Sequence, residues 1–243
     1  MFLDLFPQPK PILAMLHLKG SDRADRVQRA IAEADIYVAN GVDALIVEDY
    51  YGDATDVEAV LAALRNQRPT YTLGVNVLDD FARSYELAAQ YGAAFMQVDS
   101  ICGHLTPADE VAYHAMVDGY RRDGRVAVIG GVRFKYQPLL SGRSLAEDLA
   151  IGMRHCDAIA VTGSGTGVVT DTEKIQEFRA LLGAFPLIVG AGMTAPTAVE
   201  KLQHADGAIV GSTFKDTRKD NGEVSAAHVA EFMEVVQQAF RAV

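Results

Sequence analysis

The sequence is poor in cysteine and in the spacings that bind metals. Its 243 residues include only two cysteines, Cys102 and Cys156, and they do not form a C-x-x-C pair. This excludes a disulfide framework and a cysteine-rich zinc site, and it predicts a reduced compartment. The chain also has no H-x-H or H-E-x-x-H spacing. We therefore predict no dedicated metal site from the sequence.

Long hydrophobic runs are missing as well. No apolar run reaches the roughly 18 residues that a membrane-spanning helix needs. The partly apolar N-terminus lacks a basic segment and an A-x-A-like cleavage site, and it is interrupted by Pro7, Pro9 and Pro11. These features argue against a signal peptide and against membrane insertion. We expect a cytoplasmic protein.

Positive charge is scarce. The chain has 22 Lys and Arg residues against 32 Asp and Glu residues, which gives a net charge of −10. An acidic chain without a basic cluster is not expected to bind nucleic acid or an anionic membrane. An anion can still bind at a local site built from backbone N–H groups and a few cationic side chains.

Eight apolar, strand-like runs alternate with helical patterns. Nearly continuous apolar content is typical of strands that are buried on both faces of a parallel sheet. Helical spacing recurs between the runs, for example at Val27, Ile31 and Val38, and a last helix is expected after Ser225 as its N-cap. The runs cover residues 11–18, 44–49, 70–77, 95–101, 126–133, 158–163, 186–192 and 207–214.

This regular alternation predicts a (β/α)₈ barrel. Eight strand–helix units in 243 residues leave about 30 residues for each unit, which suits one strand, one helix and two short loops. The alternative is a doubly wound open sheet, which needs fewer strands and no even spacing. We see no linker, and we predict a single barrel domain over residues 1–243.

Polar residues lie at the predicted carboxyl ends of the first five strands, where barrels of this type place their chemistry. They are His17, Glu48, Asn76, Asp99 and Lys135. Because side chains alternate along a strand, Met15 and His17 share one face, which we expect to point into the barrel. These residues are our candidate catalytic set; the alternative is that they satisfy backbone groups or cap helices at the rim.

Several roles stay open for this set. Glu48 and Asp99 are candidates for a general base and its partner, or for ligands of a divalent cation. His17 is a candidate to polarise a carbonyl group or to carry a proton. Lys135 is a candidate for a Schiff base or, more simply, for holding a phosphate. No organic cofactor is indicated. Cys102, a candidate reactive thiol, and His104 rank lower because they lie in the following loop.

The last three predicted strands end in glycine and hydroxyl residues. Loops after the late strands of such barrels, with a short helix N-terminus, often bind phosphate. Glycine lets the backbone approach an anion closely. The alternative is that small residues only relieve crowding at the rim. The candidate phosphate-binding residues are Gly163, Ser164, Gly165, Gly190, Gly192, Gly211 and Ser212.

The chain resembles the BtpA/SgcQ family in segments that span most of its length. These include "GVDALIVEDYYGD", "LGVNVLDD", "AIAVTGSGTG" and "ADGAIVGSTFKDTRKDNGEV". The resemblance implies a barrel related to the ribulose-phosphate-binding type, and the family label implies a role in the biogenesis of photosystem I or of a membrane complex.

Two functional hypotheses follow. The first is an isomerase- or lyase-type enzyme that acts on a phosphorylated small molecule, such as a sugar phosphate or a nucleotide. The second is a non-catalytic assembly factor that uses the barrel as a scaffold. The polar strand ends favour the first, because a scaffold need not keep them. We also expect a homo-oligomer, since barrels often pair through a helix face or the rim.

Overall fold

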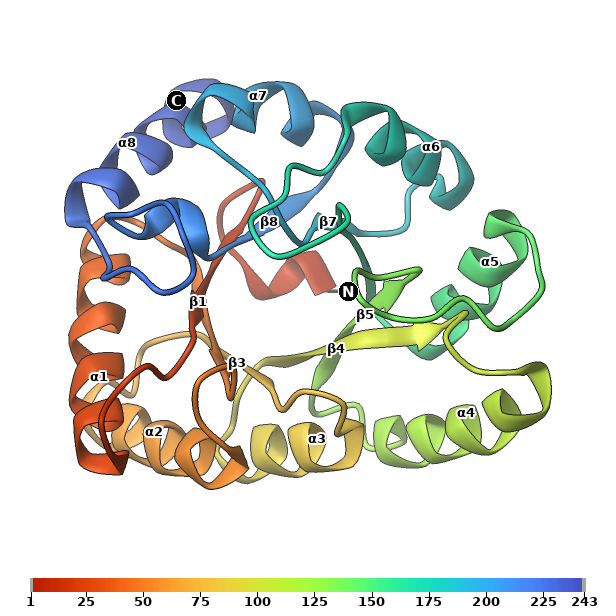
Figure 1. The fold of residues 1–243 in the computed structure, drawn as a ribbon, viewed down its shortest axis with the longest axis horizontal. Helices are drawn as coiled ribbons and strands as arrows, with labels where there is room; N and C mark the ends of the chain where they lie inside the picture. The colour runs from red at the N-terminus through yellow and green to blue at the C-terminus, as the bar shows by residue number, and fades with distance from the viewer. Residues whose placement is uncertain (1, 242–243) are drawn as a thin grey trace.

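Eight parallel strands close into a barrel in chain order, which confirms the predicted fold (Figure 1). The computed structural model describes residues 2–241. Each strand pairs with its neighbours in sequence, and the first pairs with the last. The strands are β1 (Ile12–Leu16), β2 (Ala44–Glu48), β3 (Leu73–Asn76), β4 (Phe95–Cys102), β5 (Ala127–Val132), β6 (Ala158–Val161), β7 (Leu187–Val189) and β8 (Gly207–Val210).

A helix follows each strand and packs outside the barrel (Figure 1). Side-chain caps fix where several of them begin; Asp22 and Asp80 each accept a bond from a backbone N–H of the first turn, and so does the predicted cap Ser225. The helices are α1 (Arg23–Ala39), α2 (Ala54–Gln67), α3 (Phe81–Gln90), α4 (Pro107–Arg121), α5 (Leu145–His155), α6 (Thr172–Leu182), α7 (Ala195–His204) and α8 (Ala226–Val236).

The core has two parts, which follow from the alternation of side chains along each strand. Leu13, Met15 and Ile46 belong to a cluster inside the barrel. Ile12 and Leu45 belong to the larger cluster between the barrel and its helices. His17 continues the inward face of β1, as the sequence pattern predicts. In the described part of the chain, no helix has the length and apolar character to cross a membrane.

The N-terminal segment closes one end of the barrel. A short 3₁₀ helix, η1 (Phe2–Leu5), lies in the centre of the ring of strands in Figure 1. Its Phe2 ring packs edge-on against Phe95, with centroids 5.8 Å apart, and Phe6 lies 6.2 Å from the same ring. The opposite end, where the strands end, is therefore the end that is left to hold a ligand.

Strand β4 is irregular near its carboxyl end. Its register with β5 shifts between Val98 and Cys102. Glycines in β5 make room for this bulge, since a β-carbon at Gly131 would overlap the carbonyl oxygen of Asp99.

Candidate functional site

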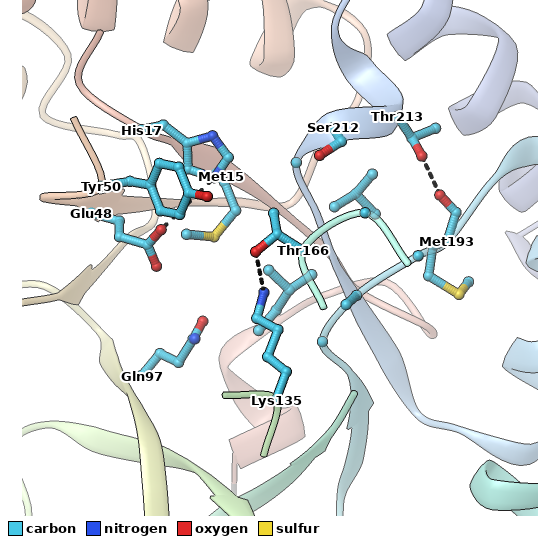
Figure 2. A pocket seen from close by; sticks show the side chains of 17 residues that line it. Met15, His17, Glu48, Tyr50, Gln97, Lys135, Thr166, Met193, Ser212 and Thr213 are labelled. Carbon is cyan, nitrogen blue, oxygen red and sulfur yellow. Dashed lines mark hydrogen bonds and ion pairs between the residues drawn. The ribbon is translucent and has the colours of Figure 1, made fainter. Parts of the chain in front are cut away.

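A cavity that is open to solvent lies at the carboxyl ends of the strands (Figure 2). Side chains with hydrogen-bonding groups form one part of the wall, and glycine-rich strand ends form the other. The polar part is made by His17, Glu48, Tyr50, Gln97 and Lys135, together with Thr166, Ser212 and Thr213.

Four of the predicted phosphate-binding residues line this cavity: Gly190, Gly192, Gly211 and Ser212. Gly211 lies where any side chain would reach the other part of the cavity wall. A β-carbon at this position would lie 3.1 Å from His17 Cε1 and 3.5 Å from Met15 Cβ. A larger side chain would therefore extend into the space between the two parts of the wall.

The glycine loop after β6 is placed differently from the prediction. Gly163, Ser164 and Gly165 do not line the cavity, whereas the next two residues, Thr166 and Gly167, do. The loop folds back on itself, so that a β-carbon at Gly163 would lie 2.7 Å from the Val169 carbonyl oxygen, and one at Gly165 would lie 2.9 Å from Tyr136 Oη. These first glycines therefore permit a tight turn that brings Thr166 and Gly167 to the cavity.

Lys135 brings a positive charge to the cavity wall. Its Nζ donates to Thr166 Oγ1 at 3.1 Å, and its backbone N–H donates to Thr162 Oγ1 at 2.9 Å. Figure 2 shows the side chain extending from the loop after β5 toward Thr166. The amine therefore lies beside the glycine-rich strand ends, as required of a lysine that holds an anion.

Glu48 is buried at the end of β2 and holds its proton. Its Oε2 accepts a hydrogen bond of 2.7 Å from the side-chain amide of Asn76, the residue paired with it in the register of β2 and β3. Burial, followed by the nearby Asp99 carboxylate, raises the pKa of Glu48 to about 8. At neutral pH this carboxyl group is a proton donor.

His17 faces Glu48 from β1 as a neutral ring. Its Nε2 lies 3.8 Å from Glu48 Oε1. Burial, followed by the ammonium group of Lys215, lowers the pKa of His17 to about 3. The Tyr50 ring packs against it, with centroids 5.0 Å apart (Figure 2). Glu48 is therefore the member of this pair that can carry a proton near neutral pH, and the neutral imidazole can form a hydrogen bond to a substrate oxygen.

Asn76 and Asp99 lie behind the cavity wall, and Gln97 takes the place on the wall itself. Gln97 Nε2 donates to Asp99 Oδ1 at 3.2 Å. Burial raises the pKa of Asp99, and the Lys135 ammonium acts in the opposite direction. Asn76 therefore holds Glu48 in position by a hydrogen bond, and Asp99 holds Gln97 in the same way. Sequence reasoning did not select Gln97, although it shares a strand face with Asp99.

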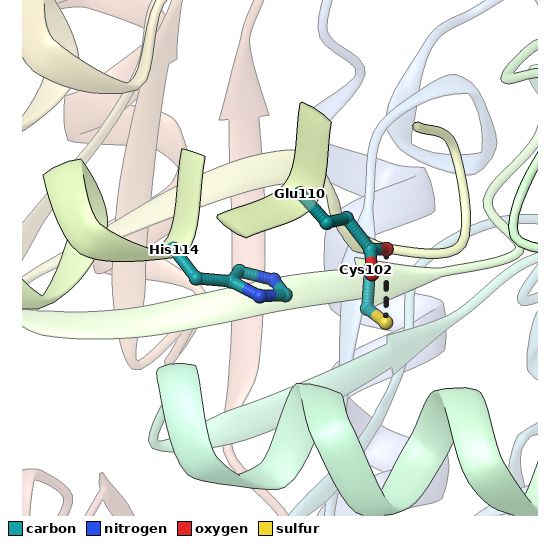
Figure 3. Close-up of side chains that lie close together, drawn as sticks. All are labelled: Cys102, Glu110 and His114. Carbon is teal, nitrogen blue, oxygen red and sulfur yellow. Dashed lines mark hydrogen bonds between the residues drawn. The ribbon is translucent and has the colours of Figure 1, made fainter. Parts of the chain in front are cut away.

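A second buried cluster lies outside this cavity, at Cys102, Glu110 and His114 (Figure 3). One ligand atom from each lies within 4.8 Å of the others. However, the guanidinium of Arg143 pairs with Glu110, and its Nη2 lies 3.4 Å from Cys102 Sγ. Arg143 therefore already compensates the buried carboxylate. Burial, followed by the nearby Glu110 carboxylate, raises the pKa of the Cys102 thiol to about 12, which argues against the predicted reactive thiol.

This cluster has a structural role. Arg143 also pairs with Asp148 of α5 at 2.9 Å, and Arg133 pairs with the other oxygen of Asp148 at 3.0 Å. Both ends of the loop between β5 and α5 are thereby fixed to one buried carboxylate. Lys135 lies on that loop, so the cluster helps to hold the lysine at the cavity.

The sequence model of the BtpA family matches residues 8–238. The chain belongs to the BtpA family. It is 27% identical to an uncharacterised protein of Pyrococcus abyssi, over 94% of this chain and 96% of that protein. It is 24% identical to the photosystem I biogenesis protein BtpA of Synechocystis sp., over 97% of this chain and 91% of the relative. The sgc region protein SgcQ of Escherichia coli is 26% identical over 69% of this chain and 65% of that protein.

Solved structures similar to this BtpA-family protein share its barrel. A thiamine phosphate pyrophosphorylase from Pyrococcus furiosus superimposes with a TM-score of 0.61 and 15% identity, covering 95% of this chain and 96% of the other. A phosphoribosyl anthranilate isomerase from Thermus thermophilus gives a TM-score of 0.61 and 14% identity, covering 94% and 98%. At this level of identity, the similarity establishes the fold alone.

Proposed function

We propose that this BtpA-family protein is an enzyme that acts on a phosphorylated small molecule. The observation that carries the proposal is the two-sided cavity at the carboxyl ends of the strands. Its glycine-rich half, with Lys135 beside it, is suited to an anion, and its other half presents Glu48 and His17. The phosphate would bind between Lys135 and the ends of β7 and β8.

The anion half is supported by its composition. Gly190, Gly211 and Ser212 line this half with small side chains, Ser212 adds a hydroxyl, and Lys135 supplies a positive charge. The Gly190 N–H already donates to the Val161 carbonyl oxygen at 2.7 Å, so this glycine contributes space and not a donor. Two of the similar barrels are named for phosphate-containing compounds, which agrees with this assignment. Thr166 and Gly167 extend the predicted phosphate-binding set, and Gly163, Ser164 and Gly165 act in it only through the turn that they form.

The chemical half favours proton transfer. Glu48, with a pKa of about 8, would donate its proton to a carbonyl or hydroxyl oxygen of the substrate and, once ionised, would accept one back. Neutral His17, whose lowered pKa makes it a weak base, would hold a substrate oxygen by a hydrogen bond. This pair suits an isomerisation or the cleavage of a carbon–carbon bond. Asn76 and Asp99 act as positioning residues behind it. Lys135 already donates to Thr166 and stands with the anion half, so we assign it to phosphate binding over a Schiff base.

A screen of phosphorylated sugars and nucleotides by thermal shift tests the proposal, because a ligand that binds only the folded protein raises its melting temperature. Compounds that stabilise the wild type are then assayed for turnover in the wild type and in Glu48→Gln. We expect Glu48→Gln to retain binding and to lose turnover. Stabilisation by no phosphorylated compound would contradict the proposal.

A non-catalytic assembly factor is the second candidate. It is favoured by the name of the Synechocystis relative and by apolar side chains exposed near the mouth of the cavity. Tyr136, Leu139 and Leu140 are 73%, 55% and 50% exposed. If this surface were the functional one, replacing Leu139 and Leu140 with serine would abolish function in cells, and Glu48→Gln would not. The enzyme proposal predicts the opposite pattern.

A further inference from the structure

A second cavity lies at the same end of the barrel, on the side of β3 and β4. Its polar lining includes Asp79, Asp99, His104 and Gln137. Phe81 and Tyr113 contribute aromatic surface. Asp99 connects it to the first cavity, because Gln97, which lines the first cavity, donates to Asp99 Oδ1 at 3.2 Å.

The second cavity is negatively charged. Asp79 accepts a bond of 3.3 Å from Gln137, and Asp99 accepts bonds from the amides of Gln97 and Asn76. Within residues 2–241, neither carboxylate has a Lys or Arg nitrogen within 4.0 Å. Lys135, the cation of the first cavity, acts on Asp99 from that cavity without forming an ion pair with it. The second cavity therefore presents two carboxylates that have no paired cation.

Among the residues that the structure describes, an unpartnered polar atom lies on the wall of each cavity, in Gln97 for the first cavity and in His104 for the second. Gln97 is 5% exposed, and its Oε1 is buried without a hydrogen-bond partner among residues 2–241. His104 Nδ1 is also buried and unpartnered. A buried amide oxygen without a donor costs free energy that a ligand N–H or O–H group would recover. A ligand group that donates hydrogen bonds would satisfy the Gln97 oxygen, and the nearby carboxylates favour a donor that carries positive charge.

The aromatic surface distinguishes an organic cation from a metal ion. A metal needs several ligand atoms that converge on one point, yet in the described part of the chain only Cys102, Glu110 and His114 bring three such atoms together. The rings of Phe81 and Tyr113 lie beside the carboxylates, with centroids 6.4 Å apart. Such rings favour alkyl carbons and an ammonium group.

We infer that the second cavity binds the ammonium group of an aliphatic amine, between Asp79 and Asp99 and next to Gln97. This inference rests on the proposed function, in which a phosphate binds beside Lys135. The ligand would then be a phosphate that itself carries an amine, or a phosphate that binds together with a separate amine. The phosphate end occupies the half beside Lys135, and the amine occupies the second cavity.

A series of ω-aminoalkyl phosphates with two to six carbons tests the inference, with the ω-hydroxyalkyl phosphates of equal length as matched controls. Dissociation constants are measured by calorimetry for the wild type, Asp79→Asn, Asp99→Asn and, as a control on a helix that lines neither cavity, Glu234→Gln. We expect one aminoalkyl phosphate to bind about tenfold more tightly than its hydroxyl counterpart. Asp99→Asn should remove that advantage, Asp79→Asn should reduce it about threefold, and Glu234→Gln should keep it.

Inorganic phosphate and n-butylamine separate the two claims. Binding of phosphate alone tests the proposed function, and it should be unchanged in Asp79→Asn. If n-butylamine and phosphate added together bind as well as the linked compound, the amine site is supported and the amine belongs to a second molecule. Equal affinity of amino and hydroxyl compounds at every length, together with no binding of n-butylamine, would overturn the inference even if phosphate binds.

Discussion

Replacing Glu48 with glutamine should change how the stability of the protein depends on pH. An unperturbed glutamate ionises near pH 4.5, whereas burial and the nearby Asp99 raise the pKa of Glu48 to about 8 in the folded chain. Between these values folding takes up one proton, so the stability of the wild type is full below pH 4.5 and falls as the pH rises toward 8. Glutamine cannot ionise, and it can still accept the hydrogen bond from Asn76.

The expected size of the effect follows from linkage. One proton taken up on folding corresponds to about 1.4 kcal/mol per pH unit, or about 4 kcal/mol between pH 5 and pH 8. Urea unfolding of both proteins at several pH values measures it. The free energy of unfolding of Glu48→Gln minus that of the wild type should rise by several kcal/mol over this range. His17 is present in both proteins, so its opposite contribution cancels in the difference. Parallel curves would refute the assignment of a protonated Glu48.

Three further predictions concern the scaffold. Arg143→Leu should lower the free energy of unfolding in urea by about 3–5 kcal/mol, because it leaves buried Glu110 and Asp148 without their shared cation. Adding Glu110→Gln should recover part of that loss, and no recovery would contradict the argument. Gly74→Ala should cost about 1–3 kcal/mol, since the new methyl group overlaps the Phe95 ring, and Phe95→Leu should relieve it. Light scattering should give the mass of a dimer or a larger oligomer; the monomer mass at micromolar concentration would contradict this prediction.

The barrel was predictable from the sequence because it depends on patterns that a sequence displays. Continuous apolar runs at even spacing indicate parallel strands, and seven of the strands lie within the predicted ranges while β4 extends one residue further, to Cys102. The alternation that puts Leu13 and Met15 inside also placed His17 correctly. The family resemblance is confirmed over most of the chain.

The details of the cavity depend on contacts between segments that are distant in sequence. Gln97 lines the first cavity and Asp99 does not, and β4 has a bulge just after Gln97. No local sequence pattern predicts that bulge. The turn of the glycine loop is set by Val169 and Tyr136, so the sequence alone did not show that Thr166, instead of Gly163, reaches the cavity. The pKa values of Glu48 and His17 likewise require burial in three dimensions.

Calorimetric titration with inorganic phosphate, in the wild type and in Gly211→Val, tests the central claim most directly. A β-carbon at Gly211 would contact His17 and fill the space between the two parts of the cavity wall. Ser212→Ala serves as a milder variant that should weaken binding by about 0.5–1.5 kcal/mol, the value of one hydrogen bond. Phosphate should bind the wild type, bind Ser212→Ala more weakly and fail to bind a folded Gly211→Val. Equal binding of phosphate to all three proteins would show that the glycine-rich strand ends do not form an anion site.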